Sequence, residues 1–144
     1  MNQSQVLDIK IRKIVTGERE LLAELIVELR NLDSIRGYID LGFANMFEYL
    51  TKGLGYSNGS AQRRIDAARL AQDIPDLPNM LQSGAVEFHL MTSMSMAVRK
   101  ARKTRKVTPA EKRELLTRVA GHNEGSTQQK VAEFFDLPLL RNTK

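Results

Sequence analysis

Apolar residues recur every three or four positions along most of the chain, which is the spacing of an amphipathic helix. Leu21, Leu25 and Leu29 show this spacing in a segment that follows Thr16 and carries two acidic residues in its first turn. Helices are predicted over 17–36, 45–52, 60–74, 77–83, 86–106, 109–121 and 126–135. We therefore predict an all-α fold of six or seven helices.

The first sixteen residues are the only part of the chain in which apolar positions alternate. Ile9 and Ile11 lie two residues apart within 6–15, a segment compatible with a strand, a helix start or an ordered arm. No glycine- or serine-rich linker and no internal repeat divides the rest. We interpret 1–16 as an N-terminal arm, 17–136 as one helical domain and 137–144 as a C-terminal tail.

Residues 46–74 have the proportions of a helix-turn-helix, with a short helix, a turn containing Gly53 and a longer second helix. On the second helix a polar stripe lies opposite the apolar arc, and Arg64 falls inside the arc, where its stem would cover the core. The candidates for contacts to DNA bases are Asn58, Ser60, Gln62, Arg63, Asp66 and Arg69. The alternative is ordinary packing of two helices with a solvated polar face.

Charge is unevenly distributed along the 144 residues. The net charge of +5 divides into −2 over residues 1–50 and +7 over 51–144, and six of the eight residues in 99–106 are cationic. Cations at a helix C-terminus complement the helix dipole, but that effect accounts for two or three of them. The candidates for contacts to DNA phosphates are Lys52, Arg99, Lys100, Arg102, Lys103, Arg105 and Lys106. The alternative partners are acidic residues of the first helix, namely Glu24, Glu28 and Asp33, or an acidic protein.

Composition removes several kinds of chemistry. With no cysteine there is no disulfide, no thiolate metal site and no cysteine nucleophile. The two histidines, His89 and His122, have no recognisable partners, and His89 is expected to pack at the edge of the core. We predict no catalytic residue, no metal and no cofactor. The sequence shows no membrane-spanning or secretory segment, so a cytoplasmic location is expected.

The segment LGFANMFEYLTKGLGYSNGSAQRRIDAARL (41–70), followed by IPDLPNMLQSGAVEFHLMTSMS, resembles the helical N-terminal region of a group of bacterial HNH endonucleases. The Ser-Thr-Gln-Gln helix at 126–129 also has a counterpart there, and 54–96 is more distantly similar to the DNA-binding helices of chromosome-partition proteins. The resemblance implies DNA binding. In that family the catalytic metal-binding segment lies downstream, and this sequence contains no such segment, so nuclease activity is not implied.

Two functions follow from these observations. The first is a non-catalytic, nucleoid-associated domain that binds double-stranded DNA, either alone or as the targeting part of a nuclease, with a homodimer as a possible form. The second is a protein-interaction or oligomerisation module, in which the Leu/Ile stripe of the first helix pairs with another chain and the basic run contacts an acidic protein. Neither function involves a membrane or a small-molecule substrate.

Overall fold

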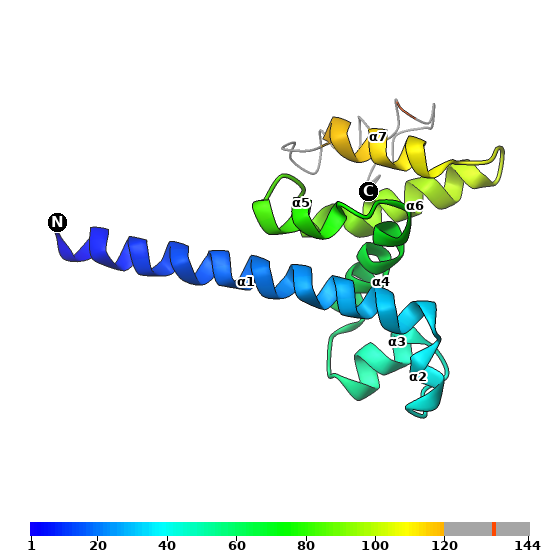
Figure 1. Ribbon diagram of the computed structural model, residues 1–144, viewed down its shortest axis with the longest axis horizontal. Coiled ribbons are helices and arrows are strands. Elements are labelled where there is room, and N and C mark those ends of the chain that lie inside the picture. Colours follow the sequence, from blue (N-terminus) through cyan, green and yellow to red (C-terminus); the bar gives the residue numbers. More distant parts are fainter. Residues whose placement is uncertain (120–133, 135–144) are drawn as a thin grey trace, which may run out of the picture.

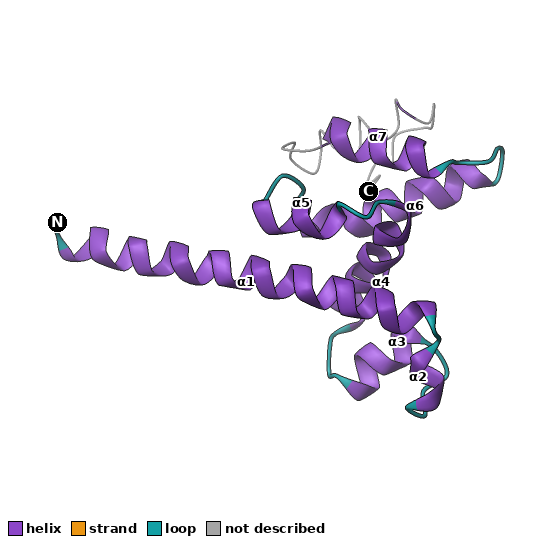
Figure 2. Ribbon diagram, in the orientation of Figure 1, coloured by secondary structure: helices purple, strands orange, loops and turns teal. Residues whose placement is uncertain are grey.

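The computed structural model describes residues 1–119 and Phe134. This part of the chain is helical and contains no strand, so the predicted all-α fold is confirmed (Figure 2). The elements are α1 (Gln3–Ser34), α2 (Gly37–Asp40), α3 (Met46–Glu48), η1 (Tyr49–Gly53), α4 (Asn58–Asp73), α5 (Leu77–Ser83), η2 (Phe88–Leu90), α6 (Met91–Arg102) and α7 (Pro109–Val119).

α1 is a single helix of 32 residues, and its first half projects away from the other helices (Figure 1). The predicted helix start at residue 17 is therefore wrong, and so is the alternative of a strand over 6–15, whereas the alternative in which this segment is helical is confirmed. The helix begins after Asn2, whose side chain accepts a hydrogen bond from the Gln5 amide while the Gln5 side chain accepts one from the Asn2 amide. This capping box was visible in the sequence. The alternating Ile9 and Ile11 obscured it.

α4 lies at the centre of the fold and contacts α1, α3, α5, α6 and α7 (Figure 1). Small side chains allow neighbours to approach it closely from several directions. Its four buried alanines are at most 1% exposed; they are Ala61, Ala67, Ala68 and Ala71. Fully buried larger side chains surround it; they include Ile26, Met46, Leu50, Ile74, Leu77, Met91, Met94, Leu115 and Leu116.

The turn before α4 depends on two glycines. A Cβ on Gly53 would stand 2.9 Å from the ring of Phe43, and Gly55 has a φ of +82°, in the left-handed region. η1 is a π-helical turn in which the Leu54 amide donates to the Tyr49 carbonyl at 3.0 Å. The helix predicted over 45–52 is thus present and ends one residue later, at Gly53.

The remaining boundaries agree with prediction in part. The helix over 77–83 is confirmed, whereas the one predicted over 86–106 is shorter, because η2 and α6 together span 88–102. α7 begins at Pro109 as predicted. The predicted helix at 126–135, the helix end at Gly121, His122 and the tail at 137–144 lie outside the described residues, apart from Phe134 within that helix.

Candidate nucleic-acid interface

The exposed start of α4 is where base contacts were predicted. Ser57 caps the helix by accepting a hydrogen bond from the Ser60 amide at 3.3 Å. Asn58 is exposed, whereas Ser60 and Arg63 are half-buried. The Ser60 hydroxyl oxygen accepts a hydrogen bond of 2.6 Å from Arg64. Asn58 and Arg63 are therefore the most available members of the predicted set at this end of the helix.

Arg64 has a local structural role. Its guanidinium lies 4.3 Å from the ring centroid of Tyr56 and 5.1 Å from that of Phe88, which comes from η2. It also donates to the Ser60 backbone carbonyl at 3.1 Å. These contacts connect α4 to the loop before it and to η2, in agreement with the expectation that Arg64 covers the core.

The polar stripe of α4 faces other helices along much of its length. Asp66 is only 4% exposed, so its assignment as an exposed base contact is wrong. Gln62 donates a hydrogen bond to Asp66 at 3.0 Å, and Arg69 lies 3.5 Å from Asp33 at the end of α1. The physical reason is the central position of α4: α1 and α6 pack on both flanks of the stripe, so its polar residues pair with neighbours.

Asp66 is the most buried acidic residue in the described part of the chain. Arg99 of α6 approaches its carboxylate to 4.0 Å. Burial raises the pKa of Asp66 above its ordinary value, while the hydrogen bond from Gln62, the nearby Thr92 hydroxyl and the charges of Arg99 and Arg69 act in the opposite direction. Asp66 thus serves to connect α4 with α6.

A polar groove of about 410 Å³ lies between α4, α6, α7 and the end of α1. Both acidic and basic side chains line it, and its charged residues are Asp33, Asp66, Asp73, Arg69, Arg99, Arg102 and Lys112. Lys112 of α7, which is only 4% exposed, donates a hydrogen bond to the carboxylate of Asp73. Because its acids are close to its bases, the groove offers little uncompensated charge.

The basic run 99–106 spans a helix end and a loop. α6 ends at Arg102, and the chain then turns at Lys103 and Thr104 and continues without helix to Thr108. The prediction that all six cations lie on the last two turns of one helix is therefore wrong. The reason is a local stop: Thr104 and Arg105 amides both donate back to the Ala101 carbonyl, which closes the helix.

Two cations of the run have acidic partners. Arg99 is near Asp66, and Arg105 donates to Glu111 at 2.6 Å, an interaction that lowers the pKa of Glu111. Thr108 and Glu111 form a capping box at the start of α7, with the Glu111 amide donating to the Thr108 hydroxyl at 3.2 Å. Arg105 therefore fixes the loop onto the start of α7.

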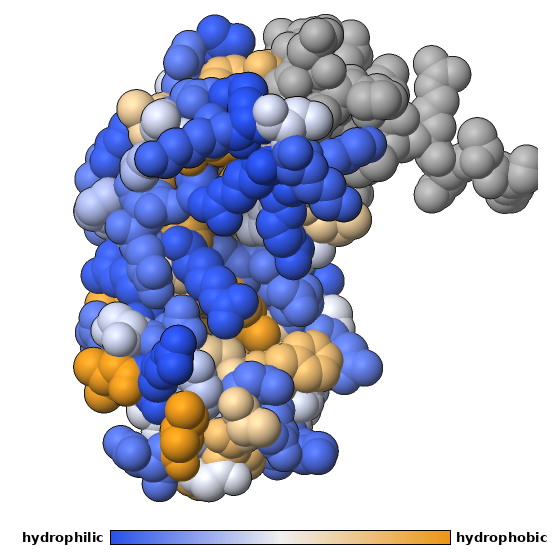
Figure 3. All heavy atoms as spheres, turned by 90° about the vertical axis from the view of Figure 1, so that its right-hand side faces the viewer, coloured by the Kyte–Doolittle hydropathy of each residue, from blue (hydrophilic) through white to orange (hydrophobic). Residues whose placement is uncertain are grey.

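The other four cations of the run are exposed and form no ion pair with any described residue; they are Lys100, Arg102, Lys103 and Lys106. None of the acids of α1 that were considered as partners contacts them: Asp33 pairs with Arg69 and Gln72, while Glu24 and Glu28 face α5. Hydrophilic side chains cover this end of the molecule, and hydrophobic ones are concentrated lower, around α2 and α3 (Figure 3).

The predicted base contacts extend along α4, and the basic run meets them only in the second half of that helix. α6 runs beside α4 so that Phe88 lies near Arg64 and Arg99 near Asp66 and Arg69. Asn58 and Arg69 are separated by about 16 Å along the α4 axis, at 1.5 Å per residue.

Lys52 is exposed on η1, near the start of α4, and pairs with Glu48 at 3.3 Å. The backbone amide of Ala44 and Lys52 lower the pKa of Glu48.

His89 is exposed, so the prediction that it packs at the core boundary is wrong; its neighbour Leu90 takes the buried position. In the described part of the chain, no three histidine or acidic side chains are grouped so that they could hold a metal ion. No helix there is long and apolar enough to cross a membrane.

Comparison with protein-family models, with curated proteins and with solved structures found no match. The resemblance to the N-terminal region of HNH endonucleases and to chromosome-partition proteins therefore stays a prediction.

Proposed function

We propose that this chain is a non-catalytic domain that binds double-stranded DNA through the cationic segment between the last turn of α6 and the start of α7. The observation that carries the proposal is the set of four exposed cations without an acidic partner among the described residues: Lys100, Arg102, Lys103 and Lys106.

A polyanion is the ligand that such a segment fits best. Like charges this close repel one another, and two acids near the run, Asp66 and Glu111, are already paired with Arg99 and Arg105. Duplex DNA carries roughly one negative charge per 1.7 Å of its axis, so a short cationic loop can contact several phosphates at once. Phosphate contacts position a protein on the duplex without reading its sequence.

We expect this binding to depend little on DNA sequence. Of the side chains predicted to contact bases, Asp66 is buried and Gln62 is hydrogen-bonded to it. A recognition helix must lie in the major groove with a face free of protein, and α4 is packed against helices on several sides. Asn58, Arg63 and the exposed Arg69 are the members of that set that remain accessible for additional contacts.

Fluorescence anisotropy with labelled duplexes of about 20 base pairs tests the proposal at salt concentrations from 50 to 200 mM. If four cations each neutralise one phosphate, a plot of the logarithm of the association constant against the logarithm of the salt concentration has a slope of about −3.6. This slope corresponds to roughly a 150-fold loss of affinity for DNA over this range. Duplexes of unrelated sequence should bind within a few-fold of one another.

A matched pair of double variants locates the interface. Arg102→Gln with Lys103→Gln should reduce the steepness of the salt dependence by about 1.8 units. Lys13→Gln with Arg36→Gln removes the same charge from exposed positions elsewhere and should leave the slope unchanged. Equal effects of the two variants, no binding at 50 mM salt, or tighter binding to polyglutamate than to DNA would each contradict the proposal.

A further inference from the structure

The first half of α1 has no contact with the rest of the described chain. Residues 1–16 are exposed without interruption, and the first contacts with other helices come from Arg19, which covers Gly84 at the end of α5, and from the buried Ala23. Figure 1 shows this half extending well beyond the body. A helical segment of about this length is marginal in water by itself, and Gly17 weakens it further.

An apolar stripe continues from the buried half of α1 into this free half. Leu7, Ile11, Ile14, Leu21 and Leu25 follow one another at intervals of four, three, seven and four residues, with Glu18 in the gap. This is the heptad spacing of helices that pair with another helix. The first four are 48%, 57%, 64% and 67% exposed, whereas Leu25 packs against the core. The stripe is therefore interrupted only at Glu18 and is uncovered along four positions.

The charges of α1 indicate what covers the stripe. Residues 3–16 carry three basic side chains and one acidic one, a net charge of +2, while 17–34 carry two basic and five acidic, a net charge of −3. A parallel pair of these helices would place like charges together, and Glu18 would meet its own copy. An antiparallel pair places the basic half of one helix on the acidic half of the other.

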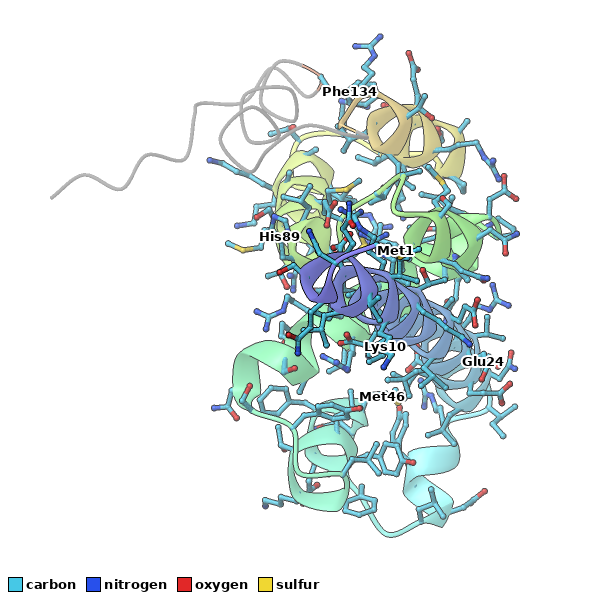
Figure 4. The ribbon with its side chains drawn as sticks, turned by 90° about the vertical axis from the view of Figure 1, so that its left-hand side faces the viewer. Met1, Lys10, Glu24, Met46, His89 and Phe134 are labelled. Atoms are coloured by element: carbon cyan, nitrogen blue, oxygen red, sulfur yellow. The ribbon has the colours of Figure 1, made fainter. Side chains whose placement is uncertain are left out.

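We infer that α1 pairs antiparallel with α1 of a second copy of this chain. With Leu7 opposite Leu25 of the other copy, Ile11 lies opposite Leu21, and Lys10 lies beside Glu24. The midpoint of the pair lies at Thr16, and the helices overlap over about 27 Å from Leu7 to Leu25. Figure 4 looks along α1 from its free end, with Lys10 and Glu24 on the same helix at positions fourteen residues apart. The two helical bodies then lie at opposite ends of the pair.

Sedimentation equilibrium of the full chain between 1 and 100 µM tests the pairing. The wild type should sediment as a dimer of the 16.3 kDa chain. Ile14→Glu should weaken the dimer by roughly 100-fold or more, because in this register each new carboxylate is buried and faces Glu18 of the other copy. Ile9→Glu is the matched control, since Ile9 is 55% exposed and lies on the opposite side of the helix. It should leave the dimer intact.

Orientation is tested by crosslinking, which the absence of native cysteine makes clean. Chains with Lys10→Cys mixed with chains carrying Glu24→Cys should form mixed disulfide dimers under mild oxidation. Disulfides between two Lys10→Cys chains would indicate a parallel pair and overturn the inference. A monomer at 100 µM, equal loss of the dimer with Ile9→Glu and Ile14→Glu, or a monomer that binds anionic vesicles through α1 would overturn it as well.

Discussion

The ion pair between Lys112 and Asp73 should behave asymmetrically when either partner is removed. Lys112 comes from α7 and its side chain is 5% exposed, whereas Asp73, at the end of α4, is 31% exposed and faces the polar groove. Asp73→Asn leaves an ammonium group buried with no full negative charge beside it. Lys112→Met keeps the aliphatic stem in place and leaves only a carboxylate that water can reach.

The magnitudes follow from this difference in burial. Breaking a buried ion pair from one side costs about 3–5 kcal/mol, and because the groove admits water we expect about 2–3 kcal/mol for Asp73→Asn. Lys112→Met should change the free energy of unfolding by less than about 1 kcal/mol, since the charge it removes was itself costly to bury. Asp76→Asn is the control, because Asp76 and Arg113 form a pair that is 60% and 47% exposed and is worth less than about 1 kcal/mol.

Urea unfolding followed by far-UV circular dichroism measures these changes, since the described chain is helical. With an m-value of about 1.5–2 kcal/mol/M, Asp73→Asn should lower the midpoint by about 1–2 M. The double variant with Lys112→Met should recover most of that loss. Equal destabilisation by the two single variants, or a loss for Asp73→Asn no larger than for Asp76→Asn, would refute the reasoning.

Two further predictions concern the core. Burial raises the pKa of Asp66 in the folded chain. Between the ordinary carboxyl pKa and this raised pKa, the folded chain binds more protons than the unfolded chain. The free energy of unfolding therefore falls as the pH rises from the first of these values to the second. Asp66→Asn should therefore gain stability over the wild type between pH 4 and pH 7 in urea titrations, and Asp40→Asn, at an exposed site, should not. Leu50→Ala, at a position with 0% exposure, should cost about 2–5 kcal/mol, and Leu54→Ala, 46% exposed, well under half of that; similar losses would contradict the described core.

Local sequence signals located most helix boundaries. Helices begin or end where the sequence carries local cap signals, because a cap satisfies backbone groups within a few residues; these signals are the pairs Asn45–Glu48 and Thr108–Glu111 and the glycine at Gly84. The start of α1 was missed although Asn2 and Gln5 supply the same signal. Ile9 and Ile11 alternate as in a strand, and this pattern led to the wrong boundary. The helix instead follows the spacing of Leu7, Ile11 and Ile14, which recur every three or four residues.

The candidate site was predictable only in part. Exposure of the cations in 99–106 followed from their charge, since such side chains stay in water. Their division into paired and unpaired members did not, because Arg99 meets Asp66 from a different helix. The stripe on α4 was misassigned for the same reason: a helical wheel shows which residues share a face but not what packs against that face.

By itself, then, the sequence determined most of the helices, their caps and the concentration of positive charge around the end of α6, because each of these depends on residues close together along the chain. Only the tertiary structure decided that α4 is central, that Asp66 is buried and that half of α1 is uncovered. These depend on which helices pack together, and close packing of one set of faces necessarily leaves others exposed.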